Sequence, residues 1–245
     1  MPRPQLPPYS LFLSLTWKQF LGRFDIILPV TLGLALPLYA LVDVTLPREL
    51  IAQNVTGSVE ELIGIISHPT YIVNVVLQVV VNVALVFIAI VIILTLQHAY
   101  HRQVITLHAL VREAIRFYPR AIVLHSITGI ITLIGLGLLL VPGIIVAVFF
   151  SMALPALVWD KLTIRAAMVA SWRMVRGRWW SVCLYLTSTY VLTDVAGWLI
   201  ITVLPNTVGF TTAGLTIAAI INVFAIIFTV VVFTGLVVKK PGLVR

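Results

Sequence analysis

Six polar or ionisable residues interrupt long apolar stretches of the chain, and they are the first candidates for chemistry. They are Asn74, Gln78, Asn82, His125, Asp194 and Asn222. Such groups are costly in an apolar surrounding and often functional. Asp194, with Tyr190 and Thr193 before it, is the only acid deep within an apolar stretch. We expect it to pair with His125, with Asn222 or with a basic residue through water, either as a proton or cation site or as a hydrogen-bonded packing residue.

Three of these candidates share one helix face. Asn74, Gln78 and Asn82 are four residues apart, so their side chains lie on the same side of a helix. A polar stripe of this kind either bonds a helix to its neighbours or lines a wet cavity. We favour the first interpretation, because amides on one face are typical of tightly packed bundles.

Three further histidines, His98, His101 and His108, are close enough in sequence to suggest a transition-metal site. Metal ligands normally come with supporting carboxylates, so we interpret them as solvated histidines and predict neither a metal site nor a cofactor. The chain has no nucleophile–histidine–acid motif, no P-loop and no dinucleotide-binding fingerprint. The residues therefore predict no enzyme.

The elements that hold these residues must be membrane helices. Hydrophobic residues make up 61% of the 245 residues and charged residues 10%, whereas soluble domains have about 45–50% and about 25%. The apolar runs are Ile26–Val42, Tyr71–Gln97, Ala121–Trp159, Val182–Leu204 and Ala213–Val238. About 20 residues cross a bilayer once, so the third run must cross twice. We predict two helices there, about 121–140 and 144–159, with a turn at Val141-Pro142-Gly143.

The predicted fold class is therefore all-α: a polytopic integral membrane protein with six transmembrane helices arranged as three hairpins, in a single membrane domain, 1–245. With both termini inside, 15 of the 16 Lys and Arg residues fall on the cytoplasmic side, and only Arg48 falls outside. The positive-inside rule supports this topology. The net charge of +8 then indicates anionic lipid, not nucleic acid, as the partner.

A basic aromatic segment precedes each predicted hairpin. Trp17-Lys18-Gln19-Phe20-Leu21-Gly22-Arg23-Phe24 matches Trp172-Arg173-Met174-Val175-Arg176-Gly177-Arg178-Trp179, and Ala114-Ile115-Arg116-Phe117-Tyr118-Pro119-Arg120 is a weaker third copy. We infer three repeat units, approximately 9–97, 104–159 and 163–238.

These segments have the composition of amphipathic helices in the membrane interface, with Ser10, Thr106 and Thr163 as expected N-caps. They either only anchor the spans or form a collar that binds anionic phospholipid or a cytoplasmic partner. The predicted lipid-headgroup or partner contacts are Trp17, Lys18, Arg23, Arg112, Arg116, Arg120, Trp172, Arg173, Arg176, Arg178, Trp179 and Trp180.

Part of the chain resembles a known family. The stretch from Gly135 to Val148, with Pro142-Gly143 at its centre, is followed by Ser151–Ala156 and then by Ala167–Trp180. This pattern resembles the membrane domain associated with bacterial glycerophosphodiester phosphodiesterases and its stand-alone inner-membrane relatives. The resemblance implies a Pro-Gly hairpin followed by a Ser-Trp-Arg basic helix in a prokaryotic inner membrane. The His, Glu and Asp cluster that would hold the phosphodiesterase metal is missing, so it implies no activity.

Two functions remain as expectations. The first is a non-enzymatic scaffold or subunit that contacts anionic lipid and partner membrane proteins at the inner leaflet. The alternative is a small transporter or channel component, with a polar path formed by the six intramembrane candidates. A membrane-embedded lipid-modifying enzyme is the least favoured, because one buried acid and scattered histidines do not make a catalytic set.

Overall fold

The computed structural model describes residues 7–45, 68–203 and 210–237, which form helices without any strand among them. Five segments are long and apolar enough to cross a membrane: Phe24–Val42, Pro69–Tyr100, Leu107–Leu138, Leu140–Trp159 and Thr212–Val237. The predicted all-α membrane fold class is thereby confirmed in outline. The helices are α1 (Tyr9–Gly22), α2 (Phe24–Val44), α5 (Pro69–Tyr100), α6 (Leu107–Leu138), α7 (Leu140–Phe150), α8 (Ala153–Trp159), α9 (Ile164–Val175), α10 (Trp179–Val203) and α11 (Phe210–Val237).

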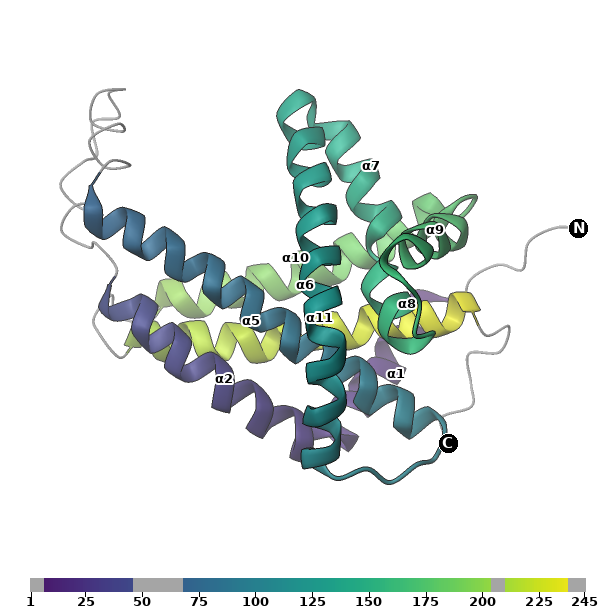
Figure 1. The fold of residues 1–245 in the computed structure, drawn as a ribbon, viewed down its shortest axis with the longest axis horizontal. Helices are drawn as coiled ribbons and strands as arrows, with labels where there is room; N and C mark the ends of the chain where they lie inside the picture. The colour runs from purple at the N-terminus through teal and green to yellow at the C-terminus, as the bar shows by residue number, and fades with distance from the viewer. Residues whose placement is uncertain (1–6, 46–67, 204–209, 238–245) are drawn as a thin grey trace, which may run out of the picture.

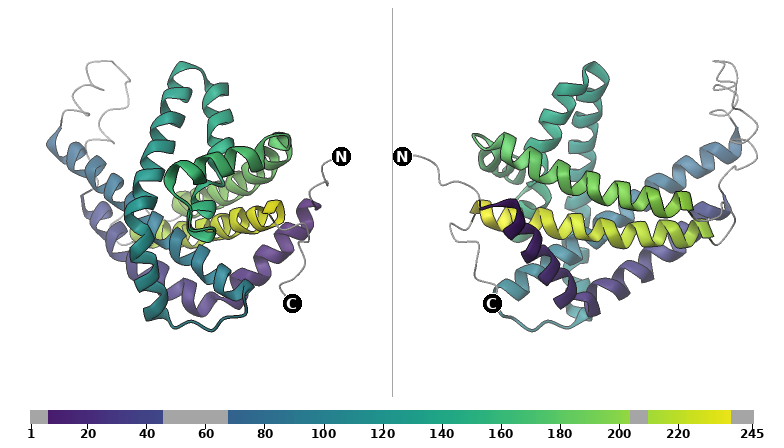
Figure 2. Two further views of the ribbon diagram at one scale, coloured as in Figure 1. Left: turned by 45° about the vertical axis from the view of Figure 1, so that its right-hand side comes forward. Right: turned by 180° about the vertical axis from the view of Figure 1, so that it is seen from behind.

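The helices do not form one close-packed cylinder. Helices α10 and α11 run side by side through the centre, and α2 and α5 pack alongside α11 (Figure 1). Helices α6 and α7 form a hairpin that projects away from these four helices. The short helices α8 and α9 lie near its base, and α1 crosses α11 on the far side (Figure 2).

The buried core follows the longest apolar runs. Every residue from Ile88 to Leu96 of α5 is buried, and so is every residue from Phe228 to Phe233 of α11. A helix that is apolar all round can be covered on every side, and these two segments occupy the middle of the molecule. The tip of the α6–α7 hairpin is the opposite case, since Leu138, Leu139 and Leu140 are largely exposed.

Helix α1 is held to the central pair by aromatic side chains. The ring of Phe12 is fully buried and contacts Tyr185 of α10 and Phe228 of α11, with ring centroids 5.7 and 6.5 Å apart. Gly235 makes this approach possible, because a Cβ there would lie 2.7 Å from the Phe12 ring. The phenol of Tyr9 adds a hydrogen bond of 3.0 Å with the Thr189 hydroxyl.

The turn of the α6–α7 hairpin lies slightly earlier than predicted. The extended residue is Leu139 (φ −159°, ψ 139°), and Pro142 and Gly143 belong to the first turn of α7. Proline is tolerated there because the first backbone N–H groups of a helix have no partner within it. The predicted 144–159 helix is also divided, because Ser151 and Met152 form a turn between α7 and α8.

The second basic segment is not a separate helix, which corrects the prediction. Helix α6 runs without a break from Leu107 through Arg120 to Leu138, with Pro119 inside it. The other two copies end in Gly-Arg, and Gly177 has the positive φ (87°) that favours glycine and ends a helix. Because Pro119 replaces the glycine, its φ stays helical, and the segment continues into the span.

Two of the three predicted N-caps are confirmed. Thr106 accepts a hydrogen bond from the Ala109 N–H, and Thr163 accepts one from the Ala166 N–H, both at 3.4 Å. The prediction for Ser10 is wrong, because α1 begins at Tyr9, so that Ser10 lies inside the helix and Pro8 is the N-cap.

Close packing of the hairpin depends on two glycines. A Cβ added to Gly135 would lie 2.8 Å from the Cα of Gly143, and a Cβ on Gly143 would overlap Leu136. We therefore expect Gly143→Ala to lower the free energy of unfolding by about 1–3 kcal/mol, because overpacking forces the helices apart. Thermal unfolding of the purified protein in detergent measures this change.

Gly137 is the matched control for this prediction. It lies on the same hairpin, but an added Cβ meets nothing within 4 Å. Gly137→Ala should leave stability unchanged or raise it by up to about 1 kcal/mol, because alanine favours the helix. Equal melting temperatures for the two variants would contradict the close approach of α6 and α7.

Candidate functional site

The fold brings together two of the six intramembrane candidates. Asn82 of α5 and His125 of α6 both line a cavity of about 540 Å³ between α5 and the α6–α7 hairpin, which we call the lateral cavity. Residues of α8, α10 and α11 also line it. The lateral cavity is open rather than enclosed, and its volume lies in the range of small-molecule sites, about 300–1,000 Å³.

Seven polar side chains line the lateral cavity among mostly apolar ones: Asn82, His125, Thr128, Thr132, Ser151, Tyr190 and Thr229. Four of them donate to a carbonyl acceptor of the preceding turn. The hydroxyls of Thr128, Ser151 and Thr229 each donate to a backbone carbonyl one turn earlier, and the Asn82 amide donates to the Gln78 carbonyl at 2.8 Å. Within the described part of the chain, the side chains of His125 and Thr132 form no hydrogen bond.

The other candidates lie elsewhere. Asn74 is buried and donates to the Val42 carbonyl at 3.2 Å and to Thr45 at 3.4 Å, so it joins α5 to α2. Gln78 is exposed, and Asn222 donates to the Ala218 carbonyl of its own helix. The helix face that carries Asn74, Gln78 and Asn82 is therefore covered by α2 at Asn74, exposed at Gln78 and open to the lateral cavity at Asn82. Asp194 lies in α10, but its side chain is outside the described residues.

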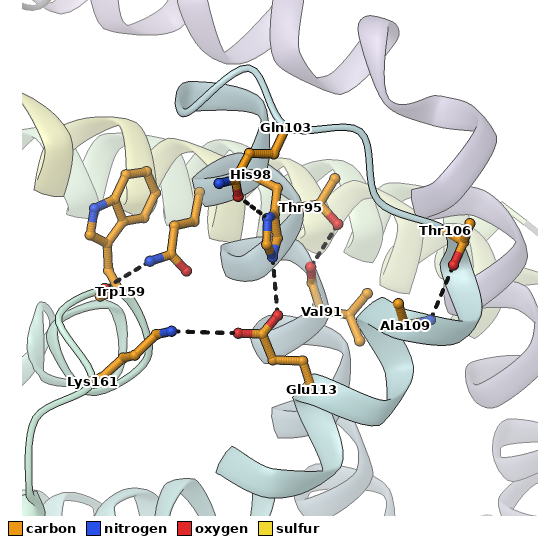
Figure 3. Close-up of polar contacts among 10 residues, drawn as sticks. Val91, Thr95, His98, Gln103, Thr106, Ala109, Glu113, Trp159 and Lys161 are labelled. Atoms are coloured by element: carbon orange, nitrogen blue, oxygen red, sulfur yellow. Dashed lines mark hydrogen bonds and ion pairs between the residues drawn. The ribbon is translucent and has the colours of Figure 1, made fainter.

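A second polar cluster lies where α5 ends, α6 begins and α8 meets α9 (Figure 3). We call it the Glu113 junction. The carboxylate of Glu113 accepts a hydrogen bond from His98 Nε2 at 3.0 Å and lies 4.0 Å from the Lys161 ammonium. His98 Nδ1 is 2.8 Å from the Gln103 side chain. One acid thus links three separate elements of the chain.

The span that ends beside this cluster is fixed by Gln97, whose side-chain amide donates to the Trp159 carbonyl at 2.8 Å. Asp160 follows at the end of α8, and partial burial raises the pKa of its carboxyl above the usual range. The charged carboxylate is therefore less favourable in the folded protein than in the unfolded chain. The free energy of unfolding should fall as the pH rises through the pKa of Asp160.

The histidine cluster considered for a metal is divided. His98 belongs to the Glu113 junction, whereas His101 and His108 are exposed. In residues 7–45, 68–203 and 210–237, no group of three or more His, Cys, Asp and Glu side chains is placed to hold a metal ion.

The basic residues of α6 form an exposed stripe. Arg112, Arg116 and Arg120 are four residues apart, all are exposed, and none has an ion pair with a described residue. The opposite face of the same segment is buried through Leu110, Ala114 and Ala121.

Helix α9 has the same two-sided character. Its buried face is Ala167, Ser171 and Val175, and Ser171 donates to the Phe149 carbonyl at 2.6 Å. Trp172 stacks on the Phe149 ring with centroids 3.8 Å apart, and Arg173 is exposed. At the end of α9, Arg176 is the C-cap residue and Arg178 is half-buried. At the start of α10, Trp179 donates to the Ile145 carbonyl, and Trp180 is 73% exposed.

The predicted contacts near the N-terminus lie on α1 and just after it. Lys18 is exposed, and Arg23 stands between α1 and α2. Trp17 is 56% exposed but also contacts Phe20 and Phe224, with ring centroids about 6 Å away. It therefore packs partly against the middle of α11 and is only in part a surface residue.

Sequence reasoning missed part of both clusters. Thr128 and Thr132 follow His125 at three and seven residues, the spacing of one helix face, and this signal could have found them. Glu113 is the only acid among the basic residues from Arg102 to Arg120, which marks it as a partner. Lys161, Ser151 and Thr229 carry no such signal, because they come from distant parts of the chain.

Loss of the acid should loosen the Glu113 junction. We expect Glu113→Ala to lower the free energy of unfolding by about 1 kcal/mol, because His98 and Lys161 lose their shared partner at a half-buried site. The link after α5 should then open more often, so trypsin should cut faster after Arg102 in the folded protein. Arg112→Ala, at an exposed neighbour without an ion pair, is the control, and equal cleavage of both variants would contradict the junction.

The chain was also compared with known proteins. No family model, no curated protein and no solved structure matches it. The resemblance to the membrane domain of the phosphodiesterase family therefore stays a prediction.

Proposed function

We propose that this chain is a non-enzymatic, six-span protein of a prokaryotic inner membrane that acts as a scaffold or subunit. On this proposal, its cytoplasmic face contacts anionic phospholipid and partner membrane proteins. The family resemblance of the Pro142-Gly143 hairpin and of the Ser171-Trp172-Arg173 helix supports the same setting. No cofactor is part of the proposal.

The proposed six spans are the five segments that are long and apolar enough to cross a membrane, together with α10. The pairs would be α2 with α5, α6 with α7 and α8, and α10 with α11. The arrangement of the helix ends supports this topology, because the end of α5 and the start of α6 lie away from the tip of the α6–α7 hairpin (Figure 1). Both termini would then be cytoplasmic.

The exposed arginine stripe on α6, formed by Arg112, Arg116 and Arg120, carries the functional proposal. Arg112, Arg116 and Arg120 are exposed and form no ion pair with a described residue, so their guanidinium groups are accessible to an outside partner. Phosphate oxygens of lipid headgroups are suitable acceptors for such guanidinium groups. Exposed Lys18, Arg165 and Arg173 would extend the basic surface over α1 and α9.

A transporter or channel component is the second candidate, and the lateral cavity favours it. Asn82 and His125 face one space there, as a polar path would require. The contacts of Asn74 with α2 and of Asn222 with its own helix support packing roles for these two residues instead. The scaffold remains the better supported function for this reason.

The arginine stripe is tested by lipid binding. Each basic residue near an anionic surface contributes about 1 kcal/mol, so the triple variant R112Q/R116Q/R120Q should bind anionic phospholipid at least tenfold more weakly. Native mass spectrometry of the purified protein with phosphatidylglycerol, and with phosphatidylcholine for comparison, measures the difference. R112K/R116K/R120K should keep most of the binding, and an unchanged affinity of the Gln variant would refute the proposed lipid contact.

The topology is tested by cysteine accessibility in a Cys183→Ala background. A cysteine at position 139 should react with an impermeant thiol reagent added outside intact cells, whereas one at position 104 should react only after the membrane is opened. The same reaction at both positions would exclude the six-span arrangement. Reaction of cysteines at both 82 and 222 with a water-soluble reagent would favour the transporter.

A further inference from the structure

The scaffold proposal gives no role to the lateral cavity, whose lining is mostly apolar. Its walls are apolar side chains of α5, α6, α7, α8 and α11, and none of the described residues that line it is Asp, Glu, Lys or Arg. It is not enclosed, and it lies between α5 and the α6–α7 hairpin, whose segments are long and apolar enough to cross a membrane. A molecule dissolved in the bilayer could therefore enter from the side.

Polar groups without partners are concentrated on one wall of this cavity. His125, Thr128 and Thr132 lie on the same face of α6, and the side chains of His125 and Thr132 form no hydrogen bond with any described residue. Across the cavity, Asn82 uses its amide N–H for the Gln78 carbonyl and keeps its side-chain oxygen as an acceptor. In hydrocarbon, such groups need a partner, and the described residues around the cavity do not supply one.

The chemistry of the lining selects an uncharged ligand. An imidazole, an amide and a hydroxyl together donate and accept hydrogen bonds, which suits a hydroxyl or an ester carbonyl. A phosphate or an ammonium group would enter without a counter-ion, which is unfavourable in an apolar site. The apolar walls suit an alkyl chain.

We propose that the lateral cavity binds an uncharged amphipathic lipid, with its hydroxyl or ester group at His125, Thr132 and Asn82 and its alkyl chain along α5 and α6. This proposal rests on the cavity alone and not on the arginine stripe, so either can fail without the other. Two kinds of lipid have this combination of an uncharged polar group and an alkyl chain. A diacylglycerol has hydroxyl and ester groups, and a long-chain alcohol has a hydroxyl only.

Photo-crosslinking of the full-length purified protein in lipid nanodiscs tests the proposal. The probes are a diazirine-labelled diacylglycerol, a diazirine-labelled hexadecanol and a diazirine-labelled phosphatidic acid as the charged comparison. At least one uncharged probe should label α5 near Asn82–Ile93 and α6 near Leu124–Leu133 saturably, and its unlabelled form should compete. Which of the two does so identifies the source. Preferential labelling by phosphatidic acid, or unsaturable labelling along all exposed helices, would overturn the proposal.

Two variants locate the bound molecule. His125→Leu removes the unpartnered imidazole and should weaken binding about fivefold, the loss expected for one hydrogen bond. Leu133→Trp fills the cavity from a position that is 69% exposed, so it should block labelling without disturbing the core. Ser126→Ala changes an exposed neighbour of His125 outside the lining and should bind like the wild type. Wild-type labelling of both H125L and L133W, in protein that melts normally, would refute the site.

Discussion

Hydrocarbon offers no hydrogen bonds, and the rest of this structure depends on that constraint. Every backbone group in a span must be satisfied within its own helix, so an apolar chain of this kind becomes a set of long helices. Side chains follow the same rule. Thr95, Thr128, Thr189 and Thr229 all donate to a carbonyl of the preceding turn of their own helix, and Asn222 does the same with its amide. Charged groups such as the α6 arginines remain exposed.

The remaining interactions explain why the helices are packed unevenly. Aromatic and branched side chains surround α11 and the second half of α5, whereas the α6–α7 hairpin is held mainly through its own glycines and through its base. Polar clamps reinforce the base, with Glu113 joining α5, α6 and the α8–α9 link. The lateral cavity lies between α5 and the part of the hairpin nearer its base, where Leu124–Leu133 of α6 and Ala147 and Phe150 of α7 line it.

Local signals predicted individual elements well where one residue type decides the geometry. Thr106 and Thr163 act as N-caps as expected, because a side-chain acceptor before an apolar helix has few other uses. The repeat pattern was less reliable, because it treated Pro119 as equivalent to Gly22 and Gly177. Gly177 ends α9 with a positive φ, whereas the ring of Pro119 holds a helical φ, so the second copy continues into its span.

The sequence by itself determined that the helices belong in a membrane, the fold class and the approximate limits of the helices. The physical reason is that apolar length and the placement of Lys and Arg are properties of the chain alone. Only the tertiary structure decided which polar residues meet. Asn74 and Asn82 share a helix face, yet one joins α2 and the other lines a cavity with His125. The physical reason is that helix periodicity sets the direction of a side chain, whereas its partner depends on how separate helices cross. That crossing is governed by close contacts such as Gly135 with Gly143, between residues that no local pattern pairs.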